Sequence, residues 1–181
     1  MQIHPAAEGH GLVFVRADRH GAAIPAVARL LNGSSLSTTL SRGSDTIATV
    51  EHVLSALAGL GVDNARIEVE GPEIPILDGS AQPFLERIRE AGLRAQSGLR
   101  RFVTLTRPVR VRDGDKEILA LPANDLEISY AIDFPHPAIG YQAVTTRIDP
   151  ATYAREIAPA RTFCLLRDVD EMRRSGLARG G

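Results

Sequence analysis

The sequence contains one cysteine, no tryptophan and only 4% aromatic residues. A single cysteine, Cys164, excludes a disulfide within the chain and a cysteine-rich zinc module. The scarcity of aromatic rings disfavours a surface that binds single-stranded nucleic acid by base stacking. The 21 Lys and Arg residues against 22 Asp and Glu give a formal net charge of −1, without the basic excess of nucleic-acid-binding proteins. We therefore expect no nucleic-acid partner.

Long apolar runs are also missing. None approaches the roughly 20 residues that a membrane-spanning helix needs. Residues 1–5 lack the charged and then apolar layout of a secretory signal. We expect a cytoplasmic protein without a transmembrane segment. The 181 residues, 44% of them hydrophobic, suit one packed domain or two small ones.

Helical and strand patterns alternate along the first half of the chain. Residues 11–16 form a short apolar run and residues 65–70 alternate between apolar and charged, so both predict strands. Residues 36–40 are a weaker strand candidate. From Thr49, the plausible N-cap, apolar residues recur at helical spacing until the glycines at 59 and 61. A second helix is expected after Ser80, its cap, and ends before Gly92. Its apolar stripe is Phe84, Leu85 and Ile88.

The second half of the chain is richer in strand patterns. The expected strands are 102–112, 117–121, 126–134 and 143–148, with a short helix after Pro150 and another over 167–174. The economical interpretation is an α+β fold of two similar small domains, each a sheet with helices on one face. The expected boundaries are residues 1–94 for the first domain, a polar linker over 95–101, and 102–181 for the second.

The most suggestive pair of functional side chains is Glu51 and His52, at the start of the first predicted helix. Neighbouring helical side chains diverge by about 100°, so such a pair can reach two atoms of one site. In metallohydrolases an imidazole binds zinc, and a free carboxylate accepts a proton from the zinc-bound water. The residues alone leave open the simpler interpretation, a solvated helix face.

Other polar residues have simpler interpretations. The Thr162 hydroxyl, between a turn and a predicted helix, could bind an oxyanion or could cap the chain turn. Residues 78–80 are expected to form a turn and a helix cap, and residues 136–137 a turn. Cys164 is expected to be a small core residue. Three further histidines, expected in solvated loops, are His4, His10 and His20.

Four strings carry a family resemblance. They are TVEHVLSALAGLGVDN at 49–64, GPEIPILDGSA at 71–81, IDFPHPAIG at 132–140 and ARTF at 160–163. Together and in this order they resemble the zinc-dependent UDP-3-O-acyl-N-acetylglucosamine deacetylases, which commit the pathway to lipid A. The resemblance implies two similar α+β domains packed with their helices between two sheets. It also implies hydrolysis of the 2-acetamido group of the UDP-linked, 3-O-acylated glucosamine, which releases acetate and the free amine.

The resemblance assigns roles to five residues. It implies that His52 is a zinc ligand and that Glu51 is the general base that activates the zinc-bound water. Thr162 matches the hydroxyl that helps bind the tetrahedral oxyanion. Leu36 falls in a stretch that touches substrate, and Phe163 matches an aromatic residue near the nucleotide.

Some of the family's site residues have no counterpart in this sequence. The family's other two zinc ligands, a His and an Asp four residues apart, would follow Gly181, as would a second catalytic His and a substrate-binding Lys. We therefore expect an incomplete zinc site, an incomplete second domain and no activity from these 181 residues alone. The family pattern also begins before Met1.

Two alternatives remain open. The chain could be a non-catalytic remnant that binds a nucleotide-sugar, an acyl ligand or a protein partner. A second chain in an oligomer could also complete the site.

Overall fold

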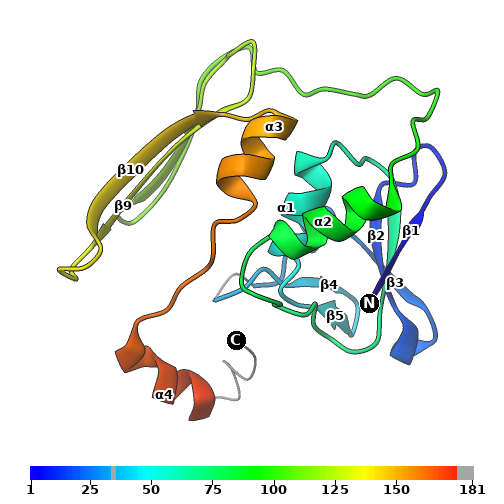
Figure 1. Ribbon diagram of the computed structural model, residues 1–181, viewed down its shortest axis with the longest axis horizontal. Helices are drawn as coiled ribbons and strands as arrows, with labels where there is room; N and C mark the ends of the chain where they lie inside the picture. The colour runs from blue at the N-terminus through cyan, green and yellow to red at the C-terminus, as the bar shows by residue number, and fades with distance from the viewer. Residues whose placement is uncertain (34–35, 175–181) are drawn as a thin grey trace. The chain divides into compact units, whose positions relative to one another are not determined.

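The computed structural model describes residues 1–33 and 36–174 and shows an α+β fold in two compact units (Figure 1). The first unit comprises Met1–Gly98 and Tyr153–Gly181, and the second is Leu99–Thr152. Each unit is described by itself. The domain boundaries expected from the sequence, and the similarity of the two domains, stay predictions.

The first unit is built on a four-stranded sheet with the strand order β1-β6-β2-β3. The strands are β1 (Gln2–Pro5), β2 (Leu12–Arg16), β3 (Ala22–Pro25) and β6 (Ala65–Val69). Strands β2 and β6 run parallel, and the two outer pairs are antiparallel. Paired positions place Ile67 beside Phe14, and Phe14 beside Ile24, and all three side chains are fully buried. This apolar row forms the centre of the core.

Two helices, α1 (Glu51–Gly59) and α2 (Gln82–Ala91), pack side by side in this unit (Figure 1). Their buried side chains are Val53, Ala56 and Leu57 from α1, and Phe84, Leu85 and Ile88 from α2. Ala81, not the predicted Ser80, occupies the N-cap position of α2, although the Ser80 hydroxyl oxygen accepts a hydrogen bond from the Gln82 amide at 3.1 Å just before the helix. Gly92, at φ +83°, follows the last helical residue.

Smaller elements complete the first unit. A hairpin is formed by β4 (Leu40–Arg42) and β5 (Asp45–Ile47). Two 3-10 turns span Ala17–Arg19 and Ala28–Leu30. A π-helical turn at Tyr153–Ile157 and the helix α4 (Leu166–Arg174) lie in the C-terminal part of the unit.

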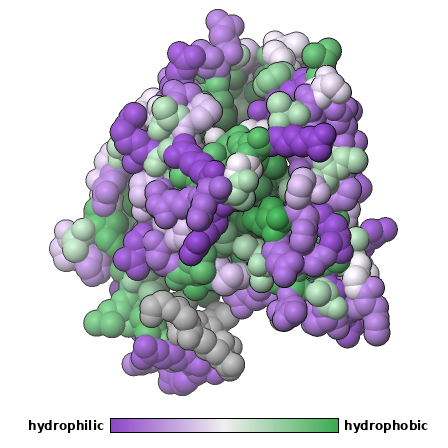
Figure 2. Space-filling model, turned by 45° about the vertical axis from the view of Figure 1, so that its right-hand side comes forward, coloured by the Kyte–Doolittle hydropathy of each residue, from purple (hydrophilic) through white to green (hydrophobic). Residues whose placement is uncertain are grey.

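The second unit contains two antiparallel hairpins and the short helix α3 (Pro150–Thr152). The hairpins are β7 (Val109–Asp113) with β8 (Lys116–Ala120), and β9 (Glu127–Phe134) with β10 (Gly140–Arg147). Residues 99–152 are all described, and none of their hydrophobic side chains is buried. This unit therefore has little core of its own, and two-stranded hairpins without such a core are only marginally stable. Figure 2 shows apolar residues among polar ones on the molecular surface.

No helix in residues 1–33 and 36–174 is long and apolar enough to cross a membrane.

Several sequence expectations about secondary structure were wrong. Residues 36–39 are not a strand, because β4 begins only at Leu40. Residues 102–108 are also not a strand. Strand β7 begins after Pro108, which has no amide to donate to a ladder. Strand β10 begins at Gly140 rather than at residue 143.

The structure also corrects predictions about three individual residues. Val50, not Thr49, occupies the N-cap position of α1, and no side chain caps that helix. His4 lies in β1 rather than in a loop, and its imidazole is 3.7 Å from the Glu68 carboxylate. Cys164 is exposed and is therefore not a core residue.

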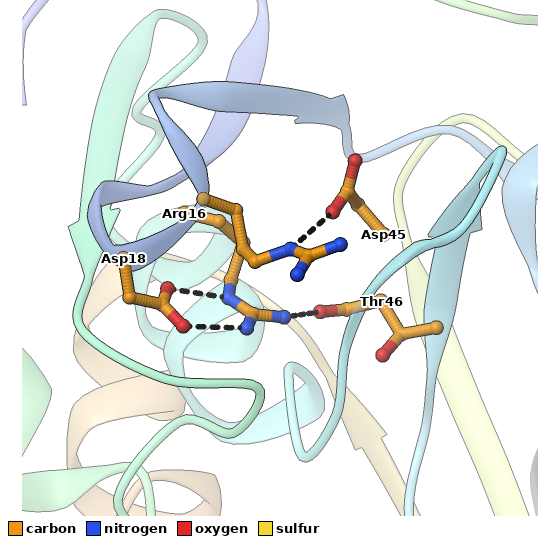
Figure 3. Close-up of polar contacts among 5 residues, drawn as sticks. Arg16, Asp18, Asp45 and Thr46 are labelled. Carbon is orange, nitrogen blue, oxygen red and sulfur yellow. Dashed lines mark hydrogen bonds and ion pairs between the residues drawn. The ribbon is translucent and has the colours of Figure 1, made fainter.

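A buried arginine links the sheet to the β4–β5 hairpin (Figure 3). Arg16 is only 7% exposed at the end of β2. Its guanidinium donates two hydrogen bonds of 2.8 Å to the Asp18 carboxylate and one of 2.6 Å to the Thr46 carbonyl. The ion pair lowers the pKa of Asp18 well below its usual range and raises that of Arg16. Nearby, Arg19 contacts Asp45 at 3.1 Å.

A close approach also joins α1 to the C-terminal part of this unit. The Tyr153 ring lies over Gly59 so closely that a Cβ built on Gly59 would be 2.2 Å from the ring. The Tyr153 hydroxyl lies 2.8 Å from the Ser55 hydroxyl, one helical turn earlier. Burial raises the pKa of Tyr153. Glycine at position 59 is therefore required by packing rather than by backbone conformation.

We predict that Gly59→Ala destabilises the protein. Helix propensity alone favours alanine by up to about 1 kcal/mol, but overpacking against the ring costs about 1–3 kcal/mol. The free energy of unfolding, measured by chemical denaturation, should fall. In the double variant with Tyr153→Ala the cost of adding the methyl group should disappear. An unchanged or higher stability of Gly59→Ala alone would contradict the packing argument.

The Arg16–Asp18 pair should make stability depend on acid pH. The pKa of Asp18 is lowered in the folded protein, whereas an Asp in the unfolded chain has a pKa of about 3.9. The ion pair therefore stabilises the folded state fully above that pH. This stabilisation should be lost progressively as the pH falls towards the folded-state pKa. The unfolding free energies of wild type and Asp18→Asn should therefore differ at pH 7. This difference should begin to shrink below about pH 4 and continue to shrink as the pH falls further. Asp125→Asn, which removes an exposed ion pair with Arg147, is the control and should show little difference at either pH.

Candidate functional site

Glu51 and His52 are the first two residues of α1, and backbone contacts hold this end of the helix. The Thr38 amide donates a hydrogen bond to Glu51 Oε2 at 2.9 Å, and the Val50 amide donates to the Thr38 carbonyl at 3.3 Å. A negative charge is favourable at a helix N-terminus, so Glu51 suits its position without any catalytic role. His52 is half-buried, and its imidazole has no hydrogen-bond partner within residues 1–33 and 36–174. The segment at Thr38 thus fixes the Glu51 carboxylate.

The residue two positions before Glu51 has an unusual backbone. Thr49 has φ +59°, in the left-handed region that β-branched residues rarely adopt, and is 5% exposed. Such a conformation costs about 1–3 kcal/mol. The Thr49 hydroxyl donates a 2.8 Å hydrogen bond to Glu73 Oε1, and a bond to a charged group contributes about 1.5–3 kcal/mol. The two magnitudes are comparable, so this bond can hold the strained turn.

Glu73 belongs to the loop of residues 71–80, which also contacts the segment before Thr49. The Ala48 amide donates to the Pro72 carbonyl at 2.8 Å, and the Ile74 amide donates to the Ala48 carbonyl at 3.0 Å. These two bonds form an isolated parallel bridge. The fully buried Ile74 anchors the loop in the core. The start of α1 is therefore attached to this loop by main-chain and side-chain bonds.

The other end of the same loop forms a tight turn. Asp78 Oδ1 accepts hydrogen bonds from the Ser80 hydroxyl at 2.8 Å and the Ser80 amide at 3.0 Å. These bonds, and more weakly the charge of Arg161, lower the pKa of Asp78. The predicted turn at residues 78–80 is confirmed, whereas the N-cap of the following helix is Ala81 rather than Ser80.

This turn holds the segment that contains Thr162. The Thr162 amide donates to the Gly79 carbonyl at 2.8 Å, and Arg161 Nε donates to the Asp78 carbonyl at 2.7 Å. A Cβ on Gly79, at φ +83°, would meet the Thr162 methyl group at 3.4 Å. Thr162 itself is exposed, and the neighbouring Phe163 is 57% exposed. The hydroxyl and the aromatic ring are therefore accessible to a ligand.

Leu36 lies two residues before Thr38, the residue that contacts Glu51. It has φ +64° and is 69% exposed. Its segment is thus adjacent in sequence to the contact that fixes Glu51. The loop 71–80 connects the start of α1 at one end and Thr162 at the other. The three strings 49–64, 71–81 and 160–163 are accordingly joined by hydrogen bonds, whereas 132–140 lies in the second unit.

Sequence reasoning missed two residues that shape this region, Thr38 and Glu73. Thr38 acts through its backbone, which no side-chain pattern reveals. Glu73 is a lone acid between prolines, and its partner is 24 residues earlier. Its only signal was its place within the string 71–81.

A metal site is not completed by these residues. Among residues 1–33 and 36–174 no three His, Cys, Asp or Glu side chains are grouped so that they could hold a metal ion. A catalytic zinc ion usually has three protein ligands and an open position. The described residues offer His52 as one candidate ligand and do not by themselves fit a zinc ion.

Comparison with known proteins identifies the family. The family model LpxC, UDP-3-O-acyl N-acetylglycosamine deacetylase, matches residues 1–181. The chain belongs to this family. Its similarity to curated family members extends over the whole chain. Proteins named UDP-3-O-acyl-N-acetylglucosamine deacetylase are 46% identical in Myxococcus xanthus, 44% in an Anaeromyxobacter strain and 45% in a Nostoc strain. The chain spans 58%, 59% and 67% of the length of these three deacetylases.

The contact between the deacetylase motifs 71–81 and 160–163 gives a prediction. Arg161→Met removes the bond to the Asp78 carbonyl, so the backbone at Thr162 should open more often. The Thr162 amide should then exchange its hydrogen several-fold faster, as measured by hydrogen–deuterium exchange.

Arg155→Met is the matched control, because the partner of Arg155 among the described residues is the neighbouring Glu156. It should leave the exchange rate of the Thr162 amide unchanged. Equal rates in the wild type and Arg161→Met would show that Arg161 does not hold the segment.

Proposed function

We propose that this family member hydrolyses the 2-acetamido group of UDP-3-O-acyl-N-acetylglucosamine in lipid A biosynthesis. The products are acetate and the free amine. The main structural support is the loop 71–80, whose hydrogen bonds reach both the residue before the α1 N-cap and the Thr162 amide. Family membership supplies the substrate, because the curated relatives carry that name. The cytoplasmic location remains a prediction.

In this proposal Glu51 acts as the general base. Its Oε2 already accepts the Thr38 amide, which orients the carboxylate. A carboxylate so fixed can take a proton from the attacking water. The Thr162 hydroxyl donates a hydrogen bond to the carbonyl oxygen as negative charge develops on it. Hydrogen bonds from the Thr162 amide and Arg161 fix the backbone that carries this hydroxyl.

We propose His52 as one ligand of the zinc ion that the family resemblance implies. Its place at the start of α1, beside Glu51, puts a nitrogen ligand next to the proposed base. Among residues 1–33 and 36–174 no two further ligands are grouped with His52. No catalytic step through the metal follows from these residues alone.

Leu36 and Phe163 are the proposed substrate contacts. Both are hydrophobic and more than half exposed, and each lies beside a segment that holds a proposed catalytic residue. Phe163 offers a ring for the nucleotide, and Leu36 an apolar surface near Glu51. Their exposure also favours a second candidate function, the binding of a nucleotide-sugar or acyl ligand without catalysis.

We predict that Glu51→Gln in the full-length gene product abolishes most acetate release and retains zinc. The amide oxygen can still accept the Thr38 amide, but it cannot act as a base, so turnover should fall by about 100-fold or more. His52→Ala should instead lower the zinc content measured by atomic absorption. Glu86→Gln, on the exposed side of α2, is the control and should behave as wild type.

Full turnover by Glu51→Gln would remove Glu51 from the proposed role. Calorimetric binding of a UDP-sugar by a wild-type protein that releases no acetate would favour the non-catalytic alternative.

A further inference from the structure

We propose that Thr49 and Glu73 are positioning residues for the site at the start of α1. This inference rests on the proposed function. The Thr49–Glu73 hydrogen bond holds a left-handed turn that directs Glu51 and His52, although neither Thr49 nor Glu73 need touch the substrate. The bond therefore acts on catalysis through the orientation of the first turn of the helix.

The first observation is where the unusual backbone conformations lie. Within the described part of the chain, the non-glycine residues with positive φ are His20, Leu36, Thr49 and Leu77. Three of these four fall in the segments that surround the candidate site. Thr49 alone among the four is β-branched and buried. Strained backbone persists where its surroundings enforce it and is concentrated at functional sites.

The second observation is what the turn controls. A change of φ at Thr49 would rotate Val50, whose amide binds the Thr38 carbonyl and whose carbonyl accepts the Leu54 amide at 3.0 Å. Glu51 follows directly. The rest of α1 is fixed independently by the buried side chains of Val53, Ala56 and Leu57. Loss of the turn should therefore disturb the first turn of the helix and leave the fold in place.

The third observation is that Glu73 is presented by a fixed backbone. Both its neighbours are bonded to Ala48, Pro72 through its carbonyl and Ile74 through its amide. The side chain of Ile74 is buried. Glu73 is itself exposed, so its contribution to folding is smaller than a core residue's, and its substitution should be tolerated.

The test compares variants of the full-length protein loaded with zinc. Thr49→Val keeps the shape but loses the donor, and Glu73→Ala loses the acceptor. Each should lower kcat by about 10-fold or more and weaken zinc affinity, as loss of residues supporting a metal site does. KM should stay within about twofold, because the substrate contacts are elsewhere.

Conservative variants supply the rescue. Thr49→Ser keeps a hydroxyl and should retain kcat close to wild type. Glu73→Gln keeps an acceptor oxygen without the charge, so its loss of kcat should be smaller than that of Glu73→Ala. Thr46→Val is the matched control, because Thr46 lies in β5 with an ordinary backbone and contributes only its carbonyl to Arg16. It should not change kcat, KM or zinc affinity.

Folded Thr49→Val and Glu73→Ala proteins with wild-type kcat and zinc affinity would overturn the proposal, as would an equal loss in Thr46→Val. If Thr49→Val fails to fold, Glu73→Ala decides. If the wild type itself releases no acetate, the proposed function is wrong, and hydrogen exchange at Val50 and Leu54 tests positioning separately. Faster exchange at these amides in Glu73→Ala supports it, and unchanged exchange overturns it.

Discussion

The start of α1 is fixed from two sides, and this constraint is the one on which the candidate site depends. On one side the backbone of Thr38 binds both Val50 and the Glu51 carboxylate. On the other side the loop 71–80 pairs with Ala48 and holds the Thr49 hydroxyl. A helix N-terminus with free amides would otherwise fray. Here two segments distant in sequence hold the first turn and the side chains on it.

The same loop extends this constraint to Thr162. Its turn at residues 78–80 precedes α2 and accepts hydrogen bonds from the Gln82 amide, from Arg161 and from the Thr162 amide. The loop can hold all these partners because it is itself anchored by the buried Ile74 at one end and by the buried Ser80 and Ala81 at the other. The core below it is the row of Ile67, Phe14 and Ile24, paired across three strands. Packing in the first unit thus determines the position of each proposed catalytic group.

Some elements were predictable because their patterns are long and periodic. Helices α1 and α2 and strand β6 each show a repeated apolar spacing over five or more residues. Strands β1, β3 and β5 were not predicted, because three or four residues give too few repeats to distinguish a strand from a loop. In the second unit β8 and β9 begin one residue from their predicted starts, and β10 begins three residues from its predicted start. No sequence pattern revealed that this unit lacks a buried core.

The candidate site was predictable from family strings and not from local chemistry. Glu51 and His52 stood out by their place at the start of a predicted helix, but their roles, and that of Thr162, followed only from the four strings considered together. Thr49 looked like a helix cap, because Thr commonly has that role and its actual partner, Glu73, is remote in sequence. Cys164 looked like a core residue from its type alone, yet it lies in an exposed segment. A long-range contact decided the role of Thr49, and exposure decided that of Cys164.

The most direct test is anomalous X-ray diffraction at the zinc edge from crystals of the full-length protein. The account predicts zinc at the start of α1, with a His52 ring nitrogen at about 2.0–2.1 Å from the metal and Glu51 beside it but not bound to it. Zinc held by other side chains, with the His52 ring turned away from the metal, would contradict the account.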